Sequence, residues 1–96
     1  MNTDEILKLK RKEVLQIAAR HGARNLRVFG STVRGSSGPT SDIDLLVDVD
    51  SLHSPFFPGG LIVDLEELLG RKVDIVTEKS LHWYLRDRVL HEAIPL

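Results

Sequence analysis

The chain has 96 residues, of which 42% are hydrophobic and 28% charged, and its formal net charge at pH 7 is −1. This length predicts a single domain over residues 1–96 with a modest core, and the charge argues against a protein that mainly binds nucleic acid. The chain contains no cysteine and no apolar run of the roughly 20 residues that span a bilayer. We therefore expect a cytoplasmic protein without disulfides, thiolate zinc sites or a membrane segment.

The first predicted element is an amphipathic helix that Asn2 or Thr3 can cap and Gly22 can end. Its apolar side chains recur at helical spacing and are Leu7, Val14, Leu15 and Ala18. A short buried strand is predicted at residues 26–29, because its side chains are mostly apolar. The Gly- and Ser-rich residues 30–38 then predict a turn or a short helix entry.

In the second half of the chain, residues 43–49 are the strongest predicted strand, and residues 51–60 form a loop rich in Pro and Gly. An amphipathic helix follows and ends at Gly70, and a third strand is predicted at residues 73–76. Ser80 can cap a last helix. The order α, β, turn, β, α, β, α predicts an α+β (α/β two-layer) fold, with a small mixed sheet packed against helices.

Two carboxylates stand two residues apart at the start of the strongest strand. Side chains alternate along a strand, so Asp42 and Asp44 point the same way, with Cα atoms about 6.5–7 Å apart. Such a pair repels unless a cation binds between them, and Mg²⁺ typically takes one or two carboxylates plus substrate phosphates. The alternative is an acidic solvent face, because Asp48 and Asp50 continue the alternation.

A second motif, Gly30-Ser31-Thr32-Val33-Arg34-Gly35, directly follows the first strand. Gly30 allows a ligand to approach the backbone, and Ser31 offers a hydroxyl and an N–H group at a helix entry, where phosphate binds well. Arg34 lies one turn later and can meet a phosphate or brace the acidic strand. The alternative is a plain Gly-Ser turn with Arg34 as a structural ion-pair partner.

The third feature is Asp74, an isolated acid within the apolar strand at residues 73–76. We expect this strand to be mostly buried, and a buried carboxylate is unfavourable unless it is paired or metal-bound. The alternative is an outward-facing residue on an edge strand. If Asp74 is part of the site, its carboxylate should face those of Asp42 and Asp44.

Together these motifs resemble the nucleotidyltransferase superfamily of the DNA polymerase β type. The chain is most similar to the small MNT-type (minimal nucleotidyltransferase) proteins that act as antitoxin partners of HEPN-domain toxins. The resemblance extends to residues 65–76, which look like the family's passage from helix to third strand, and to residues 86–96, which look like its C-terminal helix and ending. It covers nearly the whole chain.

The resemblance implies the polymerase β-like fold and two sets of site residues. The nucleotide-binding residues would be Gly30, Ser31, Arg34 and Ser41. The catalytic and metal-binding residues would be Asp42, Asp44 and Asp74, which would hold two Mg²⁺ ions. ATP would be the substrate, and AMP would pass to a protein hydroxyl, a tyrosine of a cognate HEPN toxin. The chain would then be the antitoxin of a type VII-like toxin–antitoxin pair and form a hetero-oligomer with that toxin.

Other interpretations remain open from the sequence. A non-catalytic binding module could neutralise its partner by forming a complex, or the nucleotide could pass to a small molecule or RNA. Trp83 and Tyr84 could contact a partner, although we favour core packing for Tyr84. The loop at residues 51–60 could be a partner surface, but we favour a loop packed by its own phenylalanines.

Overall fold

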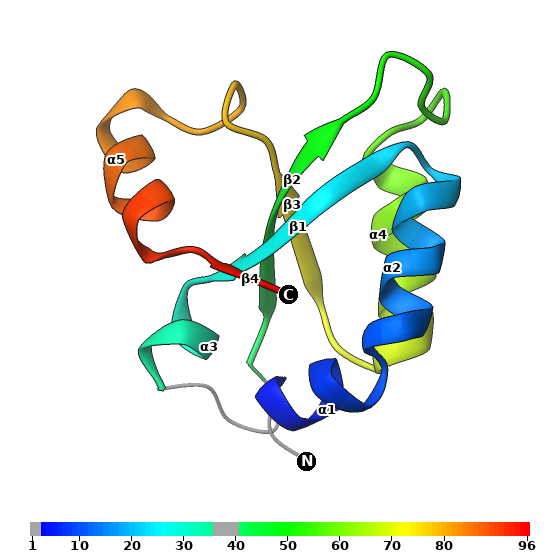
Figure 1. The fold of residues 1–96 in the computed structure, drawn as a ribbon, viewed down its shortest axis with the longest axis horizontal. Coiled ribbons are helices and arrows are strands. Elements are labelled where there is room, and N and C mark those ends of the chain that lie inside the picture. The colour runs from blue at the N-terminus through cyan, green and yellow to red at the C-terminus, as the bar shows by residue number, and fades with distance from the viewer. Residues whose placement is uncertain (1–2, 36–40) are drawn as a thin grey trace.

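The computed structural model describes residues 3–35 and 41–96 (Figure 1). The helices are α1 Thr3–Leu9, α2 Arg11–Arg20, α3 Ser31–Arg34, α4 Gly59–Leu69 and α5 Trp83–Glu92. The strands are β1 Ala23–Phe29, β2 Ile43–Val49, β3 Val73–Val76 and β4 Ile94–Pro95. No helix within these described ranges combines the length and hydropathy that would let it cross a membrane.

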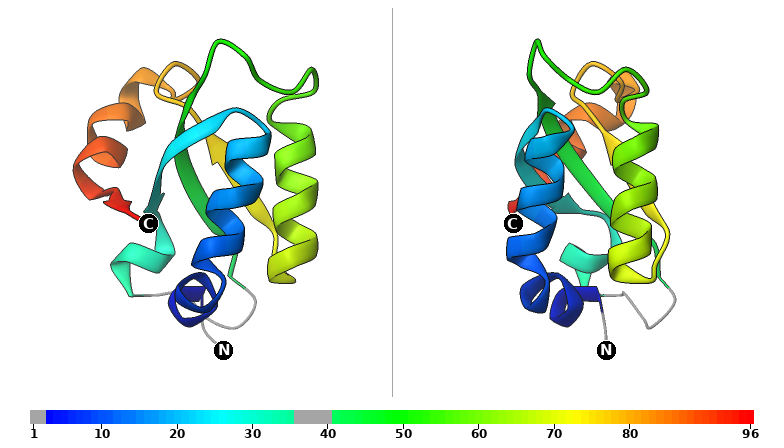
Figure 2. Two further views of the ribbon diagram at one scale, coloured as in Figure 1. Left: turned by 45° about the vertical axis from the view of Figure 1, so that its right-hand side comes forward. Right: turned by 90° about the vertical axis from the view of Figure 1, so that its right-hand side faces the viewer.

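The strands form one mixed sheet in the order β3-β2-β1-β4. β2 and β3 run parallel, whereas β1 is antiparallel to both β2 and β4. Helices α2 and α4 lie side by side on one face of the sheet (Figure 2). α5 lies on the other side (Figure 1). This arrangement confirms the predicted α+β fold.

The alternation of β2 determines where the core forms. Ile43, Leu45 and Val47 are completely buried and belong to one cluster with residues of α2 and α4 such as Val14 and Leu65. Burying each such side chain contributes about 1.5–3 kcal/mol. The opposite side chains of β2 therefore point away from this core, and two of them are Asp44 and Asp48.

The predicted first helix is two helices. The chain leaves helical geometry at Lys10, where φ is −102° and ψ is 11°, so α1 runs in a different direction from α2 (Figure 1). This change of direction lets Leu7 and Val14 both reach the core. Asn2 lies outside the described residues, and the buried hydroxyl of Thr3 accepts a hydrogen bond from Arg71 at 2.9 Å.

The predicted start of the last helix is wrong by two residues. The hydroxyl of Ser80 accepts from the Thr77 N–H and donates to the Thr77 carbonyl, which closes a local turn instead of capping a helix. His82 is the N-cap and accepts from the Tyr84 N–H. Core packing of Tyr84 is also wrong, because this residue is 71% exposed.

Two further differences concern the loop and the C-terminal residues. In the predicted loop, Phe57 packs against the core but Phe56 is 84% exposed, so only one phenylalanine packs as expected. The short strand β4 was not predicted. It pairs with β1 through Ile94 and Pro95, and two residues are too few to show an alternating pattern.

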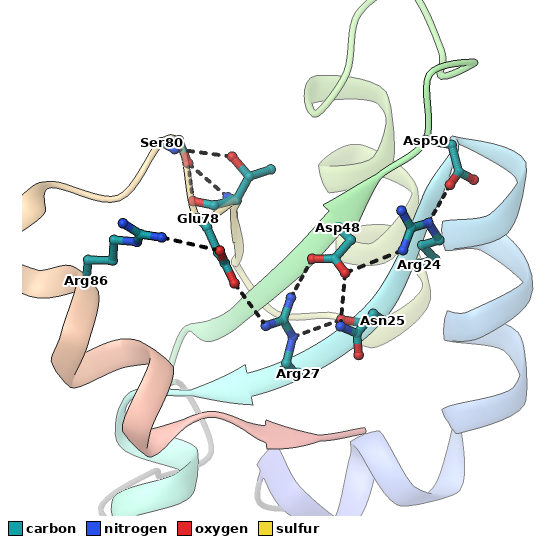
Figure 3. A network of polar contacts seen from close by, with 9 residues as sticks. Arg24, Asn25, Arg27, Asp48, Asp50, Glu78, Ser80 and Arg86 are labelled. Atoms are coloured by element: carbon teal, nitrogen blue, oxygen red, sulfur yellow. Dashed lines mark hydrogen bonds and ion pairs between the residues drawn. The ribbon is translucent and has the colours of Figure 1, made fainter.

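A polar network joins the sheet to α5 (Figure 3). The guanidinium of Arg27 on β1 donates to Asp48 on β2 at 2.8 Å and to the carbonyl of Asn25, and it lies 3.8 Å from Glu78. Glu78 also pairs with Arg86 of α5 at 3.6 Å. Because the Arg27 side chain is only 14% exposed, its loss would leave two carboxylates without their shared cation.

We expect Arg27→Met to lower the free energy of unfolding by about 1–3 kcal/mol, because Met preserves the packing of the stem and removes the charge. Arg24→Met is the matched control, since Arg24 also pairs with two carboxylates, Asp48 and Asp50, but its side chain is 60% exposed. Arg24→Met should lower the free energy of unfolding by less than about 1 kcal/mol. Urea unfolding measures both, and equal losses would contradict a central role for Arg27.

Candidate active site

Three acidic residues lie near one another where β2 and β3 begin. β2 starts at Ile43, so Asp42 directly precedes the strand and Asp44 is its second residue. The Ile43 N–H donates to the Lys72 carbonyl at 2.8 Å, which anchors the start of β2 to the start of β3. Asp42 is exposed and Asp44 is half-buried.

The register of the parallel pair places Asp44 beside Asp74. Residues paired in this way project from the same face of a sheet, on strands about 4.8 Å apart. The burial expected for Asp74 is wrong, because its side chain is exposed. The reason is that β3 is an outer strand of the sheet and the helices α2 and α4 cover only the face opposite to Asp74.

Gly30 packs against the Asp44 carboxylate. Its φ of 77° and ψ of −145° belong to a region that is open almost only to glycine. A Cβ atom at this position would collide with a carboxylate oxygen of Asp44. Gly30 and Asp44, which are 14 residues apart in the chain, are therefore in contact through a position that requires glycine.

The predicted helix entry is present but short. α3 spans only Ser31–Arg34 and ends at Gly35 in a left-handed conformation. Because α3 has only a single turn, it has no large macrodipole. Any phosphate contact would therefore depend on local N–H groups and side chains. Ser31 is the first residue of α3, and Ser41 directly precedes Asp42. Both of these predicted nucleotide-binding serines are partly buried.

Arg34 is paired with Glu92, a residue that no local sequence pattern singles out. Its guanidinium lies 3.0 Å from Glu92 at the end of α5, and the other oxygen of the same carboxylate accepts from the Gly30 N–H at 3.4 Å. Glu92 lies within the C-terminal segment that carries the resemblance. Nothing in its spacing relates it to Gly30, which is 62 residues away.

These contacts produce an electrostatic environment that disfavours the ionised form of Asp44. Burial raises the pKa of Asp44 above its ordinary value, and the neighbouring charges of Asp74, Asp42 and Glu92 raise it further, while Arg34 opposes them. The oxygen donors and the mutual repulsion suit a hard divalent cation. Among the residues that the structure describes, no three His, Cys, Asp or Glu side chains are already gathered as a metal-binding set.

The comparison with known families agrees with this geometry. A family model described as the nucleotidyltransferase domain matches residues 7–96. The chain belongs to this nucleotidyltransferase family. The match begins within α1 and includes all four strands, so it covers both motifs and Glu92.

Relatives with similar sequences cover nearly the whole chain. The protein adenylyltransferase MntA of Thermococcus cleftensis is 38% identical over 91 residues, which cover 95% of this chain and 89% of that protein. "Putative protein adenylyltransferase MJ0435" of Methanocaldococcus jannaschii is 38% identical over 94 residues, which cover 98% of this chain and 97% of the relative.

Solved structures show the same fold. A "putative minimal nucleotidyltransferase" superposes with a TM-score of 0.82 at 48% identity, over 96% of this chain and 94% of the other. A toxin–antitoxin structure with AMP-PNP gives a TM-score of 0.72 at 21% identity, over 88% of this chain and 69% of the other. The second likeness establishes the fold alone.

We expect Asp44→Asn to stabilise the metal-free protein. Because the pKa of Asp44 is raised in the folded state, the ionised carboxylate destabilises the fold at neutral pH. The half-exposed position limits the gain to at most about 1 kcal/mol, or about 4–8 °C in Tm for a domain of this size.

The pH dependence of this gain follows from the sign of the shift. It should be absent below the unfolded pKa, grow as the pH rises towards the folded pKa, and remain constant above it. Thermal unfolding in EDTA between pH 3 and 8 measures the effect. A destabilised Asp44→Asn protein at neutral pH would contradict the repulsion.

Gly30→Ala should displace the Asp44 carboxylate and lower the free energy of unfolding by about 2–3 kcal/mol, because Ala is strained at this φ and ψ. Gly35→Ala is the matched control, since Gly35 also has a positive φ, 75°, but among the described residues a Cβ atom added there would meet no atom within 4 Å other than its chain neighbours. The control should cost about 1 kcal/mol. The ¹³C carboxyl resonance of Asp44 should move only in Gly30→Ala, and an unmoved resonance would count against the contact.

Proposed function

We propose that the chain is a Mg²⁺-dependent protein adenylyltransferase that transfers AMP from ATP to a hydroxyl group of a HEPN-type toxin, and that it acts as the antitoxin of that toxin. The observation that carries the proposal is the pairing of Asp44 with Asp74 in register, with Asp42 two residues away and Gly30 packed against Asp44. The names of the relatives support protein adenylylation as the reaction.

In the proposed reaction, the chain's residues bind, orient and accept a proton. The Gly30 N–H, the Arg34 guanidinium and the hydroxyls of Ser31 and Ser41 would bind the phosphates. Asp42, Asp44 and Asp74 would hold two Mg²⁺ ions, which neutralise phosphate charge and align the reacting oxygens. The bound cations would balance the repulsion among these acids, and the phosphates would complete the coordination of the cations, so ATP and Mg²⁺ would bind together.

The bond changes follow from the chemistry of phosphoryl transfer. The acceptor hydroxyl oxygen forms a bond to the α-phosphorus of ATP, and the bond from that phosphorus to the bridging oxygen breaks, so pyrophosphate leaves. Asp74 would accept the hydroxyl proton on a carboxylate oxygen. Its exposure supports this role, because an acceptor that belongs to another protein must reach the base from solvent.

A protein acceptor also fits the exposed surface at the start of α5. Trp83 is 80% exposed and Tyr84 71% exposed, and aromatic side chains are enriched at protein interfaces. We propose that these residues contact the toxin and that the two proteins form a hetero-oligomer. One solved structure with this fold is described as a toxin–antitoxin with AMP-PNP.

The proposal is tested by intact mass spectrometry of the toxin after incubation with this protein, ATP and Mg²⁺. We expect the toxin to gain the mass of one or more AMP groups. Asp42→Asn/Asp44→Asn should lower the rate by at least about 10²-fold, because removing a group that stabilises transition-state charge has effects of this size. EDTA should abolish the reaction.

Asp50→Asn is the matched control, since it removes an exposed carboxylate at the far end of β2 and should retain the rate. Urea unfolding of the double variant verifies that it folds. If the toxin gains no mass but forms a stable, neutralised complex with every variant, the chain is a binding module and the enzymatic proposal is wrong.

A further inference from the structure

The end of α5 places a fourth carboxylate against the motif that begins at Gly30. One oxygen of Glu92 accepts from the Gly30 N–H at 3.4 Å, and the other lies 3.0 Å from the Arg34 guanidinium. The Glu92 side chain is only 15% exposed, whereas Arg34 is 48% exposed. Glu92 is therefore held inside the site, and it uses two donors of the nucleotide-binding motif.

This position is unfavourable for a carboxylate in one respect. Glu92 adds negative charge to a region that already holds three aspartates, and it is one of the groups that raise the pKa of Asp44. Its contacts with Gly30 and Arg34 offset this repulsion. A backbone N–H and a guanidinium are also the donors that bind a phosphate oxygen most effectively.

We propose that Glu92 substitutes for a phosphate group in the nucleotide-free protein, so that the nucleotide must displace Glu92 from Gly30 and Arg34 in order to bind there. This inference rests on the proposed function, because it assigns the displaced position to a phosphate of the nucleotide. Glu92 is then a competitor of the substrate within the same chain, and it lowers the apparent affinity for nucleotide.

The surroundings of Glu92 provide a place for the displaced side chain. An open groove between α3 and α5 is lined by Arg34, Asp87, Arg88, His91 and Glu92. Arg88 and His91 can receive the carboxylate once a phosphate occupies Arg34. α5 has a single buried residue, Val89, so a small movement of the helix disturbs little of the core.

A competing interpretation predicts the opposite change in nucleotide affinity when the charge of Glu92 is removed. If Glu92 only positions Arg34 for the phosphate, removing its charge should weaken nucleotide binding. If Glu92 occupies the phosphate position, the same change should strengthen binding. Glu92→Gln separates the two, because the amide has the same shape and can still accept from Gly30, but it no longer carries the charge that holds Arg34.

Isothermal titration with AMP-PNP and Mg²⁺ measures the affinity without any transfer reaction. We expect Glu92→Gln to bind about 5- to 20-fold more tightly than the wild type, and Glu92→Ala at least as tightly as Glu92→Gln. Asp87→Asn is the matched control, since it removes one negative charge from the same groove without a contact to Gly30 or Arg34. It should change the affinity less than about twofold.

A second readout follows the Gly30 amide in ¹H–¹⁵N spectra. Its resonance should differ between wild type and Glu92→Gln without nucleotide, and the two should converge when AMP-PNP saturates both. Equal or weaker binding by a folded Glu92→Gln protein, or an equal gain in Asp87→Asn, would overturn the inference and leave the proposed function standing. If neither wild type nor Glu92→Gln binds AMP-PNP, the proposed function itself fails, and this inference fails with it.

Discussion

The parallel pairing of β2 with β3 is the constraint on which the rest of the site depends. Its register sets Asp44 beside Asp74, and the same alternation directs Ile43 and Leu45 into the core. A slip of one residue would exchange the two faces and bury the acids. The core and the site are thus fixed by a single choice of register, and the apolar residues that stabilise the fold also determine where the carboxylates project.

This arrangement of acids lowers the stability of the metal-free protein. The pKa of Asp44 is raised by burial and by neighbouring acids, so part of the stability from the core is lost to repulsion at neutral pH. Gly30 adds a backbone conformation that other residues rarely adopt. Unfavourable features of this kind persist when the surrounding structure holds them in place and a ligand relieves them. A cation would relieve the repulsion among the acids, and a phosphate would take the place beside Arg34 that Glu92 occupies.

The sequence predicted the features that depend on local patterns. The alternation of residues 43–49, the apolar spacing of residues 61–69 before Gly70 and the apolar residues at 73–76 were sufficient for β2, most of α4 and β3. α4 begins at Gly59, two residues inside the predicted loop. The contact of Gly30 with Asp44 and of Glu92 with Arg34 could not be predicted, because each depends on how distant elements pack. The turn at Lys10 and the start of α5 at Trp83 were missed for a related reason: tertiary packing decided them, and it leaves no periodic pattern. For Asp74 the sequence left two interpretations open, and the exposed position on the edge strand is the one the structure has. The roles assigned to the site residues stay predictions.

α5 joins the proposed toxin-binding surface to the proposed nucleotide site. Its first residues, Trp83 and Tyr84, are exposed, and its last residue, Glu92, contacts Gly30 and Arg34. A helix of 10 residues spans about 15 Å, and this one is held by Val89, by the ion pair of Arg86 with Glu78 and by Glu92 itself. Displacement of Glu92 would therefore act on a rigid element whose other end is available to a partner. Because coupling between two sites is reciprocal, a toxin that favours the displaced position of α5 would also raise the affinity for nucleotide, so that ATP is bound most tightly when the acceptor is present.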